Sequence, residues 1–199
     1  MKPDRKRTGI ALLATALLLA ACIPSLNPFY TTKDLVFDAR LLGEWQEKDK
    51  PQEPEIWKFE KADDKGYKLQ VTEKGGKQGQ FSAHLFKLKE HYFLDLIPTD
   101  CEYATNQADL VAASMFPGHL LAHVPQIGPE LTIAFSDFDW LQKQLTNNPS
   151  ILAHRREGDS FLLTASTQEL QKFVLKHFGE GELFGKPSDM VRRSDSTAK

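Results

Sequence analysis

The sequence predicts a mainly β fold, an antiparallel up-and-down barrel or strongly curled meander with helices near 137–147 and 167–178. Apolar and polar residues alternate in many short segments, glycine-rich turns separate these segments, and two later stretches change to helical spacing. Alternation with a period of two is typical of strands with one buried and one solvated face. Closing such a sheet removes its exposed edges, which favours a barrel. An open antiparallel sheet with helices on one face, an α+β fold, is the alternative.

The first strands are expected to pair in chain order. One or two helical turns over 33–42 end at Gly43, and turn sequences at 62–66 and 74–77 contain the glycines that allow positive φ. The expected strands begin at Trp45, include Trp57 and Phe59, and continue over 67–72, 80–88, 91–97, 119–125 and 130–136. The segment 100–117 breaks this alternation, and Ala108 to Met115 within it is either a short helix or a loop.

Helical spacing appears twice in the second half of the chain. Ser136 or Asp137 is expected to cap the first helix, which ends before Pro149. Segments 151–156 and 160–165 then flank a Glu-Gly-Asp turn, a pattern that predicts a hairpin. Ser166 and Glu169 form a capping-box sequence that opens the second helix.

The N-terminal 21 residues have the layout of a secretory signal peptide. Four basic residues precede an uncharged, Leu- and Ala-rich run over 10–21, and Cys22 follows. A dozen residues at about 1.5 Å each fall short of the roughly 30 Å hydrocarbon core, so a permanent membrane span is disfavoured. We expect residues 1–21 to be cleaved.

The residues at the end of this leader, Leu19-Ala20-Ala21-Cys22, resemble the lipobox of bacterial lipoproteins. The resemblance implies cleavage before Cys22, a diacylglycerol on its thiol and usually an amide-linked acyl chain, such as palmitate. Several chains hold a protein firmly on a membrane, because each buried methylene contributes about 0.8 kcal/mol. Ile23 follows the cysteine where an Asp would favour the inner membrane, so the periplasmic face of the outer membrane is expected. The competing interpretation is ordinary secretory cleavage near a coincidental cysteine.

The rest of the chain is expected to form one domain with tails. Residues 22–32 predict a lipidated tether, 33–184 a single β-rich domain, and 185–199 a disordered tail rich in small and charged residues. Within the tether, Phe29 and Tyr30 either pack on the domain or touch lipid headgroups. Without residues 1–21 the 199-residue chain keeps 178 residues, enough for one core.

Charge and cysteine content exclude some functions. The leader holds four basic residues and Asp4, so the net charge falls from −2 for the whole chain to −5 without it. A mildly acidic protein has no electrostatic reason to bind nucleic acid. With Cys22 acylated, Cys101 is the only thiol left and no internal disulfide can form. We expect Cys101 to be either a buried inert thiol or an intermolecular partner.

Gly43-Glu44-Trp45 resembles the G-x-W motif of lipocalins. This resemblance implies that Trp45 plugs the closed end of a barrel that forms an apolar-ligand cup. It also implies an arginine stacked on the tryptophan from near the end of the barrel, with Arg155 or Arg156 as candidates. The chain departs from the family in its interrupting helix at 137–147 and in lacking a clear T-D-Y motif.

A ligand inside the barrel would contact aromatic side chains, although alternating aromatics also form an ordinary core. The predicted ligand-binding residues are Trp45, Trp57, Phe59, Tyr67, Phe81 and Tyr92, and Phe86, Phe93 and Phe135 are further candidates. His119 and His123 form the one weak metal alternative, with no third ligand evident from spacing. The sequence contains no recognised nucleophile, phosphate-loop or dinucleotide motif, and we predict no cofactor.

These features predict a lipid-anchored envelope lipoprotein without catalytic activity, binding an apolar small molecule or envelope component. The layout also resembles small uncharacterised bacterial lipoproteins, through 27–30, 43–45 and 164–170. The alternative is a scaffold lipoprotein that binds a protein partner through a sheet edge or the 108–115 segment. A metal- or thiol-dependent enzyme using His119, His123 or Cys101 is a third hypothesis.

Overall fold

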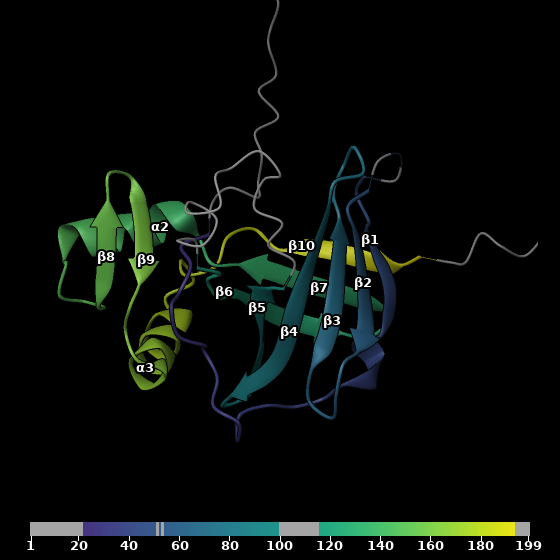
Figure 1. Cartoon of the computed structure of the whole chain (residues 1–199), viewed down its shortest axis with the longest axis horizontal. Coiled ribbons are helices and arrows are strands. Elements are labelled where there is room, and N and C mark those ends of the chain that lie inside the picture. The colour runs from purple at the N-terminus through teal and green to yellow at the C-terminus, as the bar shows by residue number, and fades with distance from the viewer. Residues whose placement is uncertain (1–21, 51, 53, 100–115, 194–199) are drawn as a thin grey trace, which may run out of the picture.

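Eight antiparallel strands close into a barrel in the computed structural model, which describes residues 22–50, 52, 54–99 and 116–193 (Figure 1). Seven of the strands pair with their sequence neighbours, and the last strand lies between the first and the seventh. The strands are β1 (Gly43–Glu47), β2 (Ile56–Lys61), β3 (Tyr67–Thr72), β4 (Gln78–Leu88), β5 (His91–Pro98), β6 (Leu120–Ile127), β7 (Glu130–Phe135) and β10 (Ser188–Arg192). The predicted up-and-down barrel is therefore confirmed.

The barrel interior is a continuous apolar core, because alternate residues of each strand point inward. Cross-strand neighbours meet there, such as Trp45 opposite Trp57 and Leu85 opposite Leu94. The tight turn between β3 and β4 uses Gly75 and Gly76, whose φ angles of 86° and 82° suit glycine. Buried residues of this inner core include Leu41, Trp45, Phe59, Tyr67, Leu69, Leu85, Leu94, Leu96, Ala122, Leu131, Ile133 and Met190.

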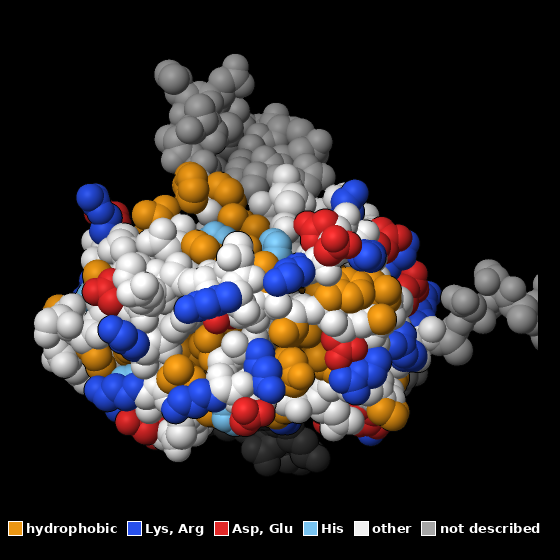
Figure 2. All heavy atoms as spheres, turned by 90° about the horizontal axis from the view of Figure 1, so that it is seen from below, with side chains coloured by type: hydrophobic (Ala, Val, Ile, Leu, Met, Phe, Trp, Pro, Cys, Tyr) orange, Lys and Arg blue, Asp and Glu red, His pale blue; other side chains and the backbone are white. Residues whose placement is uncertain are grey.

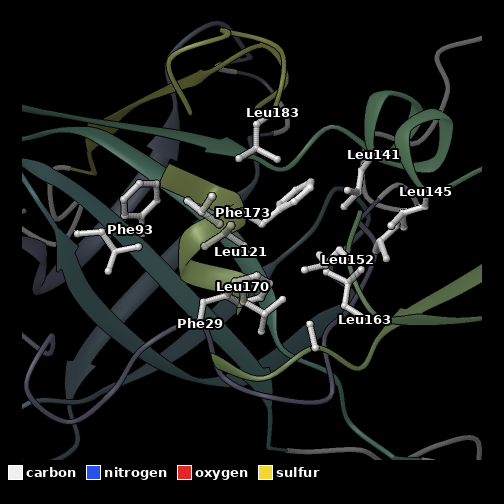
Figure 3. Packing of buried hydrophobic residues seen from close by; sticks show 14 of the residues in the cluster. Phe29, Phe93, Leu121, Leu141, Leu145, Leu152, Leu163, Leu170, Phe173 and Leu183 are labelled. Atoms are coloured by element: carbon white, nitrogen blue, oxygen red, sulfur yellow. The ribbon is translucent and has the colours of Figure 1, made fainter. Parts of the chain in front are cut away.

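An excursion between β7 and β10 packs against one side of the barrel (Figure 1). It consists of α2 (Phe138–Asn147), the hairpin β8 (His154–Glu157) and β9 (Ser160–Leu163), and α3 (Thr167–Phe178). Figure 3 shows the second core beneath it, in which Phe93 and Leu121 from the barrel's outer face meet Leu141, Leu170 and Phe173. Strands β4 to β6 are therefore buried on both faces, so their apolar residues run consecutively.

The predicted hairpin over 151–165 is confirmed, and the predicted tail needs correction. The hairpin β8–β9 forms a separate two-stranded sheet outside the barrel wall. Conversely, β10 lies inside the 185–199 segment predicted to be disordered, and it closes the barrel between β7 and β1. The sequence pattern does not predict this strand, because Met190 is its only buried residue and the strand therefore shows no alternation of apolar and polar residues.

The predicted tether is also part of the folded domain. Ile23 and Phe29 are each only 3% exposed and belong to the outer core. Ser25 exchanges backbone hydrogen bonds with His119, and Leu26 N–H donates to the Leu163 carbonyl. The segment 23–29 is thus docked along the excursion and the barrel. Contacts with residues distant in the sequence bury it, and its Pro-rich composition does not indicate such contacts.

The helix ends follow their capping residues. Asp137 caps α2 by accepting from the Trp140 N–H at 2.8 Å, and Ser166 with Glu169 forms the predicted capping box of α3. Within 33–42 the helical part is the single 3-10 turn η1 (Ala39–Leu41). It leads directly into β1.

Figure 2 shows basic and acidic side chains spread over the lower face, with hydrophobic side chains appearing in groups between them. Among the described residues, only Leu26 and Phe116 are large hydrophobic side chains classed as exposed. No described helix is long and apolar enough to cross a membrane. Cys101 and the predicted 108–115 segment lie outside the described residues.

Candidate functional site

Trp45 and its buried neighbours fill one end of the barrel. Trp45 is fully buried, and its indole N–H donates to the Leu41 carbonyl at 2.8 Å. The Arg192 guanidinium lies 4.4 Å from the centre of the indole ring. It also donates to the Leu42 and Arg40 carbonyls at 2.8 and 2.6 Å, so it joins β10 to η1. This arrangement closes the barrel's lower end.

The arginine is therefore Arg192, and the candidates Arg155 and Arg156 are wrong. Both of these lie on β8, where the Arg156 guanidinium sits over the Phe161 ring at 5.2 Å. The correction follows from the placement of the final strand, because the true closing strand was predicted to be disordered.

Tyr67 completes this closed end. Its ring stacks on Phe37 at 4.9 Å, and its hydroxyl accepts from the Asp38 N–H and donates to the Asp38 carbonyl. Burial raises the pKa of Tyr67 to about 12, so the hydroxyl stays protonated at neutral pH. Tyr67 thus fastens the segment before η1 across the barrel bottom.

The opposite end holds an apolar cavity of about 430 Å³, where β2 and β6 begin and β3, β5 and β7 end. This volume lies within the roughly 300–1,000 Å³ of typical small-molecule pockets. Glu73, Lys77 and Gln78 supply polar groups from the β3–β4 turn, so the site suits an apolar body with a polar end. The apolar lining consists of Trp57, Val71, Phe81, Leu96, Leu120 and Phe135.

Trp57 is held in one orientation at this cavity. Its indole N–H donates to the Glu55 carboxylate at 2.5 Å, and its ring lies 6.0 Å from that of Phe135. Burial raises the pKa of Glu55, although the Trp57 hydrogen bond opposes the shift. The carboxylate therefore anchors a large aromatic surface at the cavity wall.

Cys22 also lines the cavity. The residue is partly buried, burial raises the pKa of its thiol to about 11, and the neighbouring Ser136 side chain opposes that shift. A free thiol here stays protonated at neutral pH, so it is a poor nucleophile in the folded protein. The proposed lipidation position and the cavity thus meet at one end of the barrel.

The structure places only two of the six predicted ligand-binding residues, Trp57 and Phe81, at the cavity. Trp45, Phe59 and Tyr67 are buried in the core below it, and Tyr92 lies beside Lys87, whose Nζ is 5.7 Å from the ring centre. Of the further candidates, Phe135 lines the cavity, whereas Phe86 and Phe93 point outward into the second core.

Val71, Leu96 and Leu120 were missed as lining residues. They are aliphatic members of strands whose alternation was recognised, but alternation identifies the inward face without saying which end of the barrel is hollow. Strand direction carries the missing signal, because inward residues at the ends of odd strands and the starts of even strands share one rim.

The structure does not bring His119 and His123 together. His119 Nδ1 lies 2.6 Å from Asp95, which also accepts the Phe29 N–H at 2.9 Å. His123 sits among His91, Phe178 and other rings, and burial there lowers its pKa to about 4. No cluster of three metal-ligating side chains occurs within the part of the chain that the structure describes. The two histidines therefore have separate structural surroundings.

A second hollow of about 480 Å³ lies between α3 and residues 149–153. Lys172, Lys176 and the buried His177 line it, and His177 Nδ1 contacts the Glu180 carboxylate at 2.5 Å. It is a surface groove outside the barrel.

No family model, no curated protein and no solved structure matches the chain. The fold itself, a closed eight-stranded antiparallel barrel, is of a kind that serves as a binding scaffold and is consistent with a lipocalin-like topology.

Proposed function

We propose that this protein is a lipid-anchored, non-catalytic protein of the bacterial cell envelope that binds an apolar ligand in the upper cavity of its barrel. The observation that carries the proposal is the 430 Å³ apolar cavity at the barrel end where Cys22 lies. Barrels of eight strands have room for one small ligand when side chains do not fill them. The closed lower end leaves the upper end as the entrance.

The anchor is the lipobox cysteine, with the leader removed before Cys22. Ile23 in the second position supports attachment to the periplasmic face of the outer membrane. The polar groups of Glu73 and Lys77 beside the apolar lining favour an amphiphile with one polar end as the ligand class. The lipocalin resemblance supports the same use of the barrel, through the Trp45–Arg192 arrangement at the closed end.

Native mass spectrometry of the detergent-extracted protein tests both parts together. We expect the leaderless mass plus acyl groups on Cys22 for the extracted protein, and a co-purifying small molecule of apolar character on the unlipidated Cys22→Ser protein. In a parallel fractionation, Cys22→Ser is expected to release the protein from the membrane fraction. Retention of Cys22→Ser on the membrane would contradict the anchor.

The ligand part is tested separately with cis-parinaric acid, a fluorescent C18 fatty acid. The fluorescence of the probe, excited directly, is expected to rise on binding of one probe per protein in the cavity beside Trp57. A matched pair of substitutions gives the control: Val71→Trp places bulk in the cavity and should abolish binding, whereas Thr72→Trp points outward from the same strand. Equal binding by both variants would exclude the cavity as the site.

A further inference from the structure

Cys22 is held close to the cavity because the residues that follow it are fixed to the folded domain. Ile23 is buried in the outer core, and the Pro24 carbonyl accepts from Leu163 N–H at 2.9 Å. Ser25 N–H donates to the His119 carbonyl at 2.9 Å and its own carbonyl accepts from His119 N–H at 2.8 Å. Since one residue spans at most about 3.6 Å, the sulfur cannot move far from the cavity wall.

Cys22 forms part of the cavity wall. It lies beside Ser136 at the end of β7, in a cavity whose lining comes from β2 to β7. Any group attached to Cys22 therefore starts at the cavity wall.

We propose that the cavity's resident ligand is one of the acyl chains attached to Cys22 itself, while the remaining chains hold the protein in the bilayer. This inference rests on the proposed lipidation of Cys22. The apolar lining and the bilayer are comparable environments for methylene groups, so proximity decides whether an acyl chain enters the cavity or the bilayer. A chain tethered this closely has an effective concentration on the order of millimolar, well above that of free amphiphiles.

Occupation of the cavity by the protein's own acyl chain, here called self-occupation, makes access to the cavity depend on whether Cys22 is lipidated. A free amphiphile must displace the tethered chain, so its apparent affinity falls with the fraction of molecules whose cavity is empty. If the chain occupies the cavity in about 90% of the molecules, the apparent affinity falls about tenfold. The unlipidated protein has no such competitor.

The test compares lipidated protein in nanodiscs with Cys22→Ser protein exported by an ordinary secretory leader, mixed with empty nanodiscs. Residues 22–193 contain the whole described fold, so the unlipidated form keeps the cavity. We expect cis-parinaric acid to bind the Cys22→Ser protein at least tenfold more tightly than the lipidated protein. Equal affinities would overturn self-occupation while leaving the proposed ligand cavity intact. Failure of both forms to bind would overturn the proposed ligand function as well.

A direct measurement separates self-occupation from obstruction of the cavity by the bilayer. Cells fed a diazirine fatty acid incorporate it into the Cys22 lipid, and light then cross-links the chain to its neighbours. We expect cross-links from the Cys22 peptide to peptides containing Trp57, Phe81 or Leu120, lost in Val71→Trp and retained in Thr72→Trp. Cross-links to phospholipid alone would overturn the inference. Far-ultraviolet circular dichroism confirms that each variant is folded.

Discussion

Removing the Arg192 side chain is expected to weaken the closed end of the barrel more than any neighbouring surface change. Arg192→Ala deletes two hydrogen bonds, to the Arg40 and Leu42 carbonyls, and the stacking on Trp45. At this partly solvated position each hydrogen bond contributes about 1 kcal/mol, and the cation–π contact about 0.5–1 kcal/mol. The free energy of unfolding should fall by about 2–3 kcal/mol. For a domain of this size that corresponds to a decrease in Tm of about 5–10 °C.

The matched control is the adjacent Arg193. Its guanidinium makes only an exposed ion pair with Glu44 at 3.3 Å, so Arg193→Ala should cost less than about 1 kcal/mol. Arg192→Lys keeps the charge but not the planar fork that reaches two carbonyls, so it should behave like Arg192→Ala. Urea unfolding followed by tryptophan fluorescence measures all three. If Arg192→Ala and Arg193→Ala cost the same, the Arg192 contacts do not stabilise the closed end.

Three further predictions concern the outer core and the docked N-terminal segment. Asp95→Ala leaves the Phe29 N–H and His119 without their buried acceptor, at a cost of about 3 kcal/mol, and hydrogen exchange should show early loss of protection at Phe29; unchanged protection would contradict the docking role. The pKa of His123 falls from 6.5 in the unfolded chain to about 4 in the fold, so its stabilising effect is complete above pH 6.5 and is lost as the pH falls toward 4. Because the ring is only half-buried, the free energy of unfolding should fall by about 2 kcal/mol over this pH range. Denaturation curves measured at several pH values should show that His123→Phe lacks this fall and follows the wild type above pH 7. An identical dependence of the unfolding free energy on pH in both proteins would exclude His123 as its source. Ser166→Ala removes the α3 cap at a cost of about 1 kcal/mol in thermal unfolding, compared with a negligible change for Ser160→Ala on β9; equal effects would argue against the capping box.

Local chemistry accounts for what could be predicted from sequence. The alternation around Trp57 and Tyr67 requires only that neighbouring side chains point to opposite faces, and Ser166 with Glu169 caps a helix through groups three residues apart. These signals depend on a few consecutive residues, so they gave the strands, the helices and the barrel class. The predicted lipidation at Cys22 likewise depends on a local motif.

The remaining features depend on partners far apart in the chain. β10 has one buried side chain, and its strand conformation depends on pairing with β7 and β1, which no local pattern encodes. Arg192 reaches Trp45 only after that pairing, and Phe29 becomes buried only when Asp95 accepts its N–H. Periodicity determined which faces turn inward. Only closure of the barrel decided which end is plugged, which end is hollow, and that Cys22 lies at the hollow end.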